Sequence, residues 1–336
     1  MVLYSYDGNE GAHGKMTAAL ILAANTVTNK WKYKPMDDIN GASPLRRLIM
    51  VFNRAGIKNI VIVTGFESKN VVKHCSQKGV VFLDDEKYKS GGEQSALRMG
   101  LAYLKGKCSR VFVAPVYIPF FSARTVKNLC SADGAAVIPA YEKEQGYPAL
   151  ISESAFESII KYRGGGGVAG ALSGDGAQCS FHEVPDKGVT ADARRRVDLK
   201  ALIKSQGLHE IQPGSKVKLM AEQDFFGPGI SLLLQMVRET GSLRKGALQM
   251  GVSYTKSQHM VAVAEGQLGF KVMDFSPSGF RGDGLEVTKN ALELKRRYDA
   301  FSAECDALVR GAFERHFGDY DRLRDYGGEV EDKSVP

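Results

Sequence analysis

A group of polar residues near position 255 carries side chains suited to recognising another molecule. The group consists of Ser253, Tyr254, Thr255, Lys256, Gln258 and His259. Lysine and glutamine have N–H donors that can bond the edges of guanine or adenine. Tyr254 has a second interpretation, packing under a turn, and a histidine on a polar helix face is more often simply solvated. Lys256 and Gln258 are therefore ranked first as contacts to a nucleic acid base.

Three predicted helices and a hairpin position this group. Helical spacing of i, i+3, i+4 and i+7 gives the first helix one apolar face, formed by Ile230, Leu233, Leu234 and Val237. Ser242 and Ser253 are placed to cap the amino ends of the second and third helices. Strands are expected at 271–275 and 285–287, joined by a glycine-rich loop that contains Arg281. This order predicts a winged helix-turn-helix whose Arg281 contacts phosphate or the minor groove.

These segments resemble the DNA-binding domain of ModE-type molybdate regulators, which belong to the wider LysR-like winged-helix group. The resemblance rests on Phe226-Gly-Pro-Gly, Glu239-Thr-Gly-Ser-Leu, Met250-Gly-Val-Ser-Tyr and Leu-x-Val-Thr288, in the family's order and spacing. It implies that the third helix enters the major groove of double-stranded DNA with its first residues at base edges. Gly246 departs from the helix-favouring alanine of the family, at a cost of about 1 kcal/mol.

The first two-thirds of the chain alternates apolar runs with amphipathic segments. Buried strands are predicted at 18–23, 59–64, 80–83, 110–114 and 135–140, and helices at 44–54, 68–76, 93–104 and 122–130. Such alternation predicts an α/β fold, a doubly wound and mostly parallel sheet covered on both faces. Ligands bind such sheets beyond the carboxyl ends of the strands. Neither a Gly-x-Gly-x-x-Gly sequence after the first strand nor a Walker A sequence is present.

This part of the chain, from Ala18 to Ile203, is similar to MobA/MocA-type nucleotidyltransferases. The similarity is carried by Lys34-Pro-Met, Asn40-Gly-Ala-Ser-Pro-Leu45, Gly91-Gly-Glu-Gln-Ser95 and Gly146-Tyr-Pro148. It implies a Rossmann-like sheet of the nucleotide-diphospho-sugar transferase type, and transfer of a nucleotide from CTP or GTP to a molybdopterin-type acceptor with Mg²⁺. It further implies that Lys34, Glu93 and Ser95 bind the nucleotide and that Asp192 binds the metal. A solvated Lys34 and a Ser95 that only caps or packs its helix are the simpler alternatives.

Two features depart from that family. The loop after the first strand, 24–31, has no glycine, so its backbone cannot approach phosphates in the family's conformation. Tyr117 stands where the family has a metal-binding aspartate, and a phenol that titrates near pH 10 is a poor Mg²⁺ ligand. A binding pocket without turnover is therefore preferred. An active enzyme would need Asp37, Asp38 or Glu93 to replace the missing carboxylate.

Further polar and glycine-rich segments admit two interpretations each. The basic run Arg194-Arg-Arg196 follows Asp192 after one residue and is interpreted as a solvated stretch that opens a helix at 197–205. Contact with phosphate is its alternative, because the run lies near the expected pocket. Gly164 to Gly167 is interpreted as a flexible loop rather than a phosphate-binding nest.

Composition limits the classes of function. A chain of 336 residues suits two domains, and 45 Lys and Arg against 38 Asp and Glu give a net charge of +7, which favours a polyanionic partner. The five cysteines form no CxxC pair, which argues against a zinc site and a disulfide framework. No apolar run reaches the roughly 20 residues that span a bilayer, so a cytoplasmic protein without a membrane partner is expected.

Six segments are expected along the chain. They are a disordered leader at 1–16, with Met16 as a second candidate start, a transferase-like domain at 17–205, a linker at 206–223, a winged helix-turn-helix domain at 224–290, a long helix at 291–317 and a disordered tail at 325–336. The long helix carries an apolar stripe with a period near 3.5, made of Ala291, Leu294, Tyr298, Phe301, Cys305, Leu308 and Ala312. The stripe predicts a dimerisation helix. Packing against the chain's own first domain is the alternative.

Together these features predict a homodimeric DNA-binding transcriptional regulator linked to molybdenum cofactor or molybdoenzyme metabolism. Its first domain is expected to sense a nucleotide or a molybdopterin-like ligand, since the phosphate-binding loop and one metal carboxylate are lost. The main alternative is an active nucleotidyltransferase that carries an accessory DNA-binding domain. A scaffold for molybdoenzyme maturation is a weaker third hypothesis.

Overall fold

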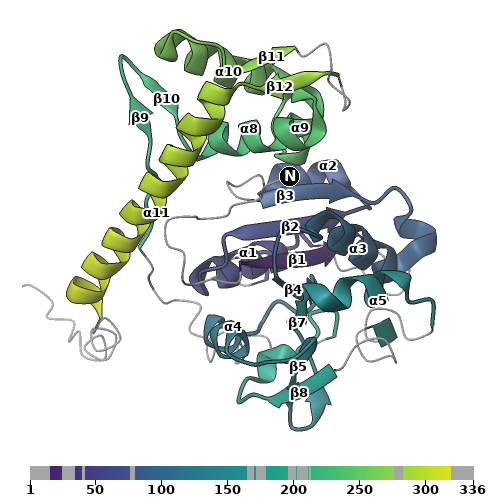
Figure 1. The fold of residues 1–336 in the computed structure, drawn as a ribbon. Helices are drawn as coiled ribbons and strands as arrows, with labels where there is room; N and C mark the ends of the chain where they lie inside the picture. Colours follow the sequence, from purple (N-terminus) through teal and green to yellow (C-terminus); the bar gives the residue numbers. More distant parts are fainter. Residues whose placement is uncertain are drawn as a thin grey trace, which may run out of the picture. The chain divides into compact units, whose positions relative to one another are not determined.

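The chain forms two compact units, residues 1–207 with 248–252 and residues 208–247 with 253–336 (Figure 1). The computed structural model describes residues 16–24, 35–39, 42–75, 80–164, 170–171, 179–195, 202, 211, 213–275 and 283–318. The tail expected at 325–336 and the expected leader up to residue 15 lie outside these ranges, as do Lys34 and Arg281. None of the described helices combines the length and apolar composition needed to cross a bilayer.

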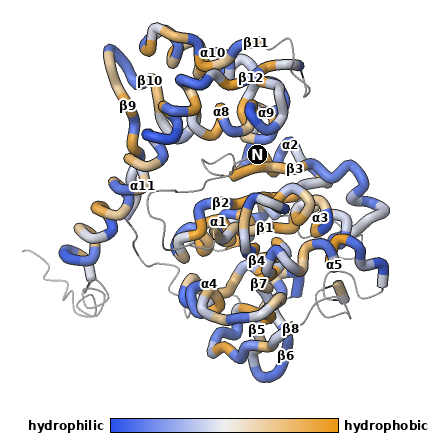
Figure 2. The backbone as a smooth tube through the Cα atoms, viewed as in Figure 1, coloured by the Kyte–Doolittle hydropathy of each residue, from blue (hydrophilic) through white to orange (hydrophobic). Residues whose placement is uncertain are grey.

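A mixed, mostly parallel sheet forms the centre of the first unit. Its strand order is β3-β2-β1-β4-β7-β5-β6, with β8 paired to β5. The parallel part comprises β1 (Thr17–Ala23), β2 (Asn59–Thr64), β3 (Val80–Asp84) and β4 (Arg110–Pro115). These strands are almost wholly buried, which their continuous apolar runs require, and Figure 2 shows the hydrophobic colour of the central strands.

The far side of the sheet differs from the sequence-based expectation. β7 (Ala149–Ser152) runs antiparallel between β4 and β5 (Ala136–Tyr141), and β8 (Cys179–Glu183) runs parallel to β5. The short β6 (Glu144–Gln145) pairs with the end of β5. The prediction had a strand at β5 but none at β7. Four residues are too few to show a period of their own, and only pairing with two neighbours makes them a strand.

Helices cover both faces of this sheet, as a doubly wound fold requires. They are α1 (Pro44–Arg54), α2 (Ser68–Cys75), α3 (Tyr88–Leu104), α4 (Ala123–Cys130) and α5 (Phe156–Lys161). Leu20 of β1 packs against α3 at Gly100, and the adjacent Phe112 of β4 packs on Phe52 of α1. Phe112 aligns with Ala19, the neighbour of Leu20 in β1. Successive side chains of a strand point to opposite faces, so Leu20 and Phe112 lie on opposite faces of the sheet. The helices that they contact, α3 and α1, therefore cover opposite faces.

Residues at the start of α3 depart from a regular helix. The helix begins at Tyr88, five residues before the predicted start, and contains Gly92 with φ 58° and ψ −159°. That conformation is open to glycine at little cost. The kink lies directly before Glu93, so Gly92 sets the direction in which Glu93 leaves the backbone.

The described residues of the second unit form four helices and two small hairpins. Its elements are β9 (Leu219–Met220), β10 (Asp224–Phe226), α8 (Pro228–Thr240), α9 (Leu243–Gln249), α10 (Tyr254–Leu268), β11 (Met273–Phe275), β12 (Leu285–Val287) and α11 (Lys289–Phe317). β11 and β12 are antiparallel and aligned as Met273 with Val287. The first hairpin begins inside the segment expected to be a linker, because its strands of two and three residues are too short for a periodic signal.

Local signals account for the ends of these helices. Gly241 and Gly269 adopt left-handed conformations after α8 and α10, with φ of 65° and 69°. Ser253 and Thr288 accept hydrogen bonds from the backbone N–H groups of Lys256 and Ala291 and so cap α10 and α11. Gly246 of α9 lies close to α8, since a Cβ there would be 3.2 Å from the Cβ of Met236. The glycine thus allows α9 to approach α8.

Apolar side chains of α8 form the centre of the second unit. Ile230, Leu233, Leu234 and Val237 are buried, as their spacing predicted, together with Ala264 of α10. α11 joins this core only through its first part, where Ala291 and Tyr298 are buried. The ring of Tyr298 meets that of Phe226 edge-on with centroids 5.1 Å apart. Further along the predicted stripe, Phe301 and Leu308 are 48% and 67% exposed.

Candidate functional site

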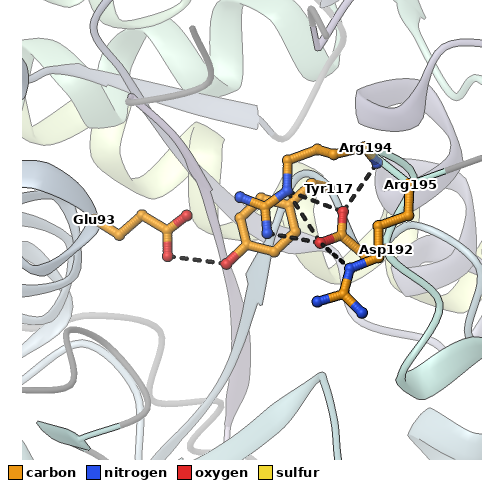
Figure 3. Close-up of polar contacts among 5 residues, drawn as sticks. All are labelled: Glu93, Tyr117, Asp192, Arg194 and Arg195. Atoms are coloured by element: carbon orange, nitrogen blue, oxygen red, sulfur yellow. Dashed lines mark hydrogen bonds and ion pairs between the residues drawn. The ribbon is translucent and has the colours of Figure 1, made fainter. Parts of the chain in front are cut away.

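Five polar side chains gather beyond the carboxyl end of β4 in the first unit. They are Glu93, Tyr117, Asp192, Arg194 and Arg195 (Figure 3). Glu93 comes from α3 and Tyr117 follows β4, whereas the other three follow the short turn Lys187–Val189. A hydrogen bond of 2.8 Å from the Ala193 N–H to the Tyr117 carbonyl joins the segment after Val189 to the segment after β4. This cluster is called the Asp192–Arg194 site below.

Asp192 and Arg194 form a two-pronged ion pair at the centre of this site. The Arg194 Nε lies 2.9 Å from Oδ1 and 3.1 Å from Oδ2 of Asp192, and its Nη2 lies 2.7 Å from Oδ2. The Arg194 backbone N–H also donates to Oδ1, at 2.9 Å. Arg195 approaches Oδ2 at 4.0 Å from the other side. Such forked contacts are among the stronger hydrogen bonds of proteins because both partners are charged.

The Arg194 guanidinium also lies over the ring of Tyr117. Its central carbon is 3.4 Å from the ring centroid, a cation–π contact that holds the arginine in place. The Tyr117 hydroxyl donates to Oε2 of Glu93 at 3.1 Å. The five side chains therefore form one connected chain of contacts from α3 to the segment 192–195.

Burial raises the pKa of two groups in this chain of contacts, Glu93 and Tyr117. Loss of hydration raises the pKa of Glu93, and the nearby Asp192 carboxylate adds to the rise, while the Tyr117 hydroxyl and Arg194 oppose it. Burial also raises the pKa of Tyr117, and the charge on Glu93 raises it further. Tyr117 therefore stays a neutral hydrogen-bond donor at physiological pH.

These residues do not form a suitable set of ligands for a divalent cation. Proteins usually hold Mg²⁺ through one or two carboxylates together with water and phosphate oxygens, but both Asp192 oxygens accept hydrogen bonds from Arg194, and Tyr117 offers only a neutral phenol. Among the described residues no group of three or more His, Cys, Asp or Glu side chains is arranged to hold a metal ion. Asp37 and Asp38, the other candidate carboxylates, are both exposed. The site combines two arginines with Asp192 and with Glu93, whose raised pKa favours the neutral carboxyl, and this balance favours an anion.

Of the two other predicted nucleotide contacts, Ser95 alone belongs to the described residues. Ser95 is half-buried on α3, two residues beyond Glu93. Lys34 lies outside the described residues. Sequence reasoning named Asp192 but interpreted Arg194 as part of a solvated run. The Asp-x-Arg spacing was the available signal, since it permits the turn in which the Arg194 N–H bonds the aspartate.

A second group of predicted contacts lies on α10. Ser253, Tyr254, Thr255, Lys256, Gln258 and His259 are all exposed, whereas Ser257 and Ala264 are buried. The helix therefore turns its predicted recognition residues to solvent. Tyr254 has an additional contact that sequence reasoning missed, because the guanidinium of Arg244 on α9 lies 4.5 Å from its ring centroid. Both residues border a cavity of about 290 Å³ that also touches Phe275 and Leu285 of the second hairpin.

Comparisons with known proteins bear on the first unit. Residues 19–179 match the family model of the MobA-like NTP transferase domain, a segment that includes Glu93 and Tyr117 and ends before Asp192. No protein of the curated set matches the chain.

Solved structures similar to the first unit include several nucleotidyltransferases. A nucleotidyl transferase from Methanothermobacter thermautotroptrophicus has a TM-score of 0.49 and 16% identity over 59% of this chain and 100% of its own. Rv0371c from Mycobacterium tuberculosis H37Rv, in a complex with manganese, has a TM-score of 0.46 and 17% identity over 57% of this chain and 99% of its own. The 4-diphosphocytidyl-2C-methyl-D-erythritol synthase from Anaerococcus prevotii has a TM-score of 0.45 and 14% identity over 59% of this chain and 97% of its own.

The sequence match and the strand order concern the same segment. The matched residues 19–179 span β1 to the first residue of β8. The strands and helices of that segment form a mixed, mostly parallel α/β sheet with helices on both faces. Residues 19–179 therefore form a MobA-like NTP transferase domain.

Proposed function

We propose that the protein is a DNA-binding transcriptional regulator whose transferase-like domain binds a ligand and no longer catalyses transfer. The exposure of the first half of α10 carries this proposal. Its polar residues face solvent over two turns, while Ala264 and Ser257 fix the opposite face in the core of the unit. In DNA-binding proteins of the helix-turn-helix class such a helix lies in the major groove.

The chemistry of the exposed residues fits double-stranded DNA. Lys256 and Gln258 have the donors that read guanine and adenine, and Lys245 on α9 adds an exposed positive charge. The Ser253 cap holds the first turn of α10 in place, which orients these side chains. The antiparallel β11–β12 hairpin supports the proposed wing, and Arg281 belongs to the segment between its strands. A protein with a net charge of +7 is also attracted to DNA at long range.

The ligand-binding part of the proposal rests on the Asp192–Arg194 site. A nucleotide or a molybdopterin-like ligand bound near Glu93 and Ser95 would alter DNA binding if it prefers one of two arrangements of the protein. Participation in molybdenum cofactor or molybdoenzyme metabolism is part of the same proposal and follows from the resemblance to ModE-type and MobA-type proteins.

An active nucleotidyltransferase using CTP or GTP is the second candidate, favoured by the match of residues 19–179. Two contacts weigh against catalysis, because Asp192 is bound by Arg194 and Tyr117 is a neutral phenol, so neither is suited to hold Mg²⁺. Release of pyrophosphate from CTP or GTP with Mg²⁺ and a molybdopterin-type acceptor would favour the enzyme.

Fluorescence anisotropy tests the regulator with the full chain and DNA fragments selected from a random library. We expect wild type to select one sequence and Lys256→Ala to bind that sequence more weakly. If Lys256 contacts a phosphate, the variant should also reduce the slope of log K against log salt concentration by about one. Gln258→Ala should instead relax sequence preference, at about 1–3 kcal/mol for the affected base. Lys161→Ala removes another exposed lysine, from α5 of the first unit, and serves as the control. Failure of wild type to select any sequence would refute the proposal.

A further inference from the structure

We propose that Arg194 takes the place of a divalent cation, so that this site binds a phosphate-bearing ligand without metal. The inference deepens the ligand-binding role proposed above and does not depend on DNA binding. It concerns the chemical class of the ligand and the requirement for metal. In nucleotide-binding sites a cation commonly neutralises phosphate oxygens beside a carboxylate. Here a guanidinium occupies the position beside the carboxylate.

Hydrogen bonds from Arg194 occupy the carboxylate of Asp192. Its side chain is 11% exposed, and both of its oxygens accept hydrogen bonds from Arg194. A metal ion could reach these oxygens only after the guanidinium had left them. Departure would also break the contact of Arg194 with the Tyr117 ring, 3.4 Å from its centroid. The aspartate therefore serves to position Arg194.

Positive charge exceeds negative charge directly around Asp192. Arg194 and Arg195 both lie within 4.0 Å of this one carboxylate, so the arginines carry one positive charge more than the aspartate. Glu93 is the other acidic group of the cluster, and it is joined to Tyr117 rather than to an arginine. A divalent cation would meet two like charges, whereas an anion would be attracted.

Both arginines are accessible to a ligand from solvent. The side chain of Arg194 is 31% exposed and that of Arg195 is 75% exposed. Asp192 engages Nε and Nη2 of Arg194, which leaves its Nη1 with no hydrogen bond to the described residues. A guanidinium edge held in a fixed orientation is well suited to two phosphate oxygens. Arg194 and Arg195 together fit a group with more than one negative charge, such as a diphosphate or triphosphate.

Isothermal titration calorimetry of the full chain with inorganic pyrophosphate, in EDTA and in Mg²⁺, tests the inference. We expect wild type to bind in EDTA with nearly the affinity found in Mg²⁺, and to show no saturable binding of Mn²⁺ alone. Binding that requires Mg²⁺, or no binding under either condition, would overturn the inference. These wild-type measurements do not depend on the folding of any variant.

Variants assign the binding to Arg194. Arg194→Ala should weaken pyrophosphate binding in EDTA about tenfold or more, because a hydrogen bond to a charged group is lost. Arg194→Lys keeps the charge but not the fork and should lie between Ala and wild type. Arg124→Ala, which removes an exposed arginine from α4, should bind as wild type does. Equal weakening by Arg124→Ala and Arg194→Ala would reject the site, and thermal melting of each variant reports whether it is folded.

CTP and GTP in EDTA then identify the source of the phosphate. Tighter binding of one nucleotide than of pyrophosphate points to a nucleotide, and equal affinities point to recognition of phosphate alone; both results support the inference. The DNA-binding assay is independent of these measurements. If wild type binds pyrophosphate without metal but binds no DNA, the proposed regulator is refuted and the inference about this site stands.

Discussion

Glu93 and Tyr117 show how burial changes the chemistry of individual residues in this protein. The tyrosine hydroxyl donates to the glutamate, and loss of hydration raises the pKa of both groups. A raised pKa of a carboxyl means that the folded state holds its proton to higher pH than the unfolded chain does. Folding therefore becomes less favourable as the pH rises through this range.

Glu93→Gln should remove this pH dependence. At a pH below the ordinary carboxyl pKa of 4.5, Glu93 is protonated in both folded and unfolded chains, so wild type and variant should have similar free energies of unfolding. As the pH rises from there through the higher folded pKa, wild type should lose stability relative to the variant. Urea unfolding at a series of pH values measures the difference.

Glu157→Gln is the matched control for that experiment. Lys105 lowers the pKa of Glu157, and Lys161 lowers it further, so any effect of this variant has the opposite sign. It should appear above the ordinary carboxyl pKa and disappear as the pH falls, and it should be small because the pair is exposed. A Glu93→Gln variant that is less stable than wild type at neutral pH would contradict the burial argument.

At the scale of elements, two glycines in helices illustrate opposite packing environments. Gly100 of α3 faces β1, where a Cβ would lie 2.3 Å from Cδ1 of Leu20. Gly266 of α10 is exposed, and a Cβ there would meet no atom within 4 Å. Close packing of α3 on the sheet thus requires glycine, whereas α10 does not.

Alanine at these two positions should change stability in opposite directions. Gly100→Ala should destabilise the first unit by about 1–3 kcal/mol, because the added methyl group forces α3 away from β1. Gly266→Ala should stabilise the second unit by up to about 1 kcal/mol, because alanine favours the helix more than glycine does. Urea unfolding of each full-length variant measures both. Stabilisation by Gly100→Ala would contradict the packing of α3 described here.

At the scale of the whole molecule, the later part of α11 carries apolar side chains that the described part of one chain leaves exposed. Phe301 and Leu308 continue the stripe of Ala291 and Tyr298 but are largely exposed. A stripe with a period near 3.5 is typical of helices that pair with another helix. We propose that two copies of the chain associate through this part of α11.

Leu308→Glu should convert such a dimer to a monomer, since a charge would be buried between two helices. Ala307→Glu places the same charge next to the stripe, at an exposed position, and should leave the dimer intact. Light scattering coupled to size-exclusion chromatography gives the mass of each. A wild-type protein that is monomeric at all concentrations would refute the proposed dimer.

Sequence periodicity by itself determined most of the helices and strands. The strand expected at 18–23 is β1, and the apolar spacing of Ile230 to Val237 identified the buried face of α8. Capping by Ser242 and Ser253 was also predictable. These features depend on residues close in sequence, whose spacing repeats with the pitch of a helix or the alternation of a strand.

Only the tertiary structure decided which distant residues meet. Asp192 was predicted as a metal ligand, but its pairing with Arg194 over the ring of Tyr117 depends on the meeting of two segments about 75 positions apart. The antiparallel position of β7 between β4 and β5 is likewise a result of competition among strands for partners. Such pairings depend on the packing of the whole sheet, which local spacing does not record.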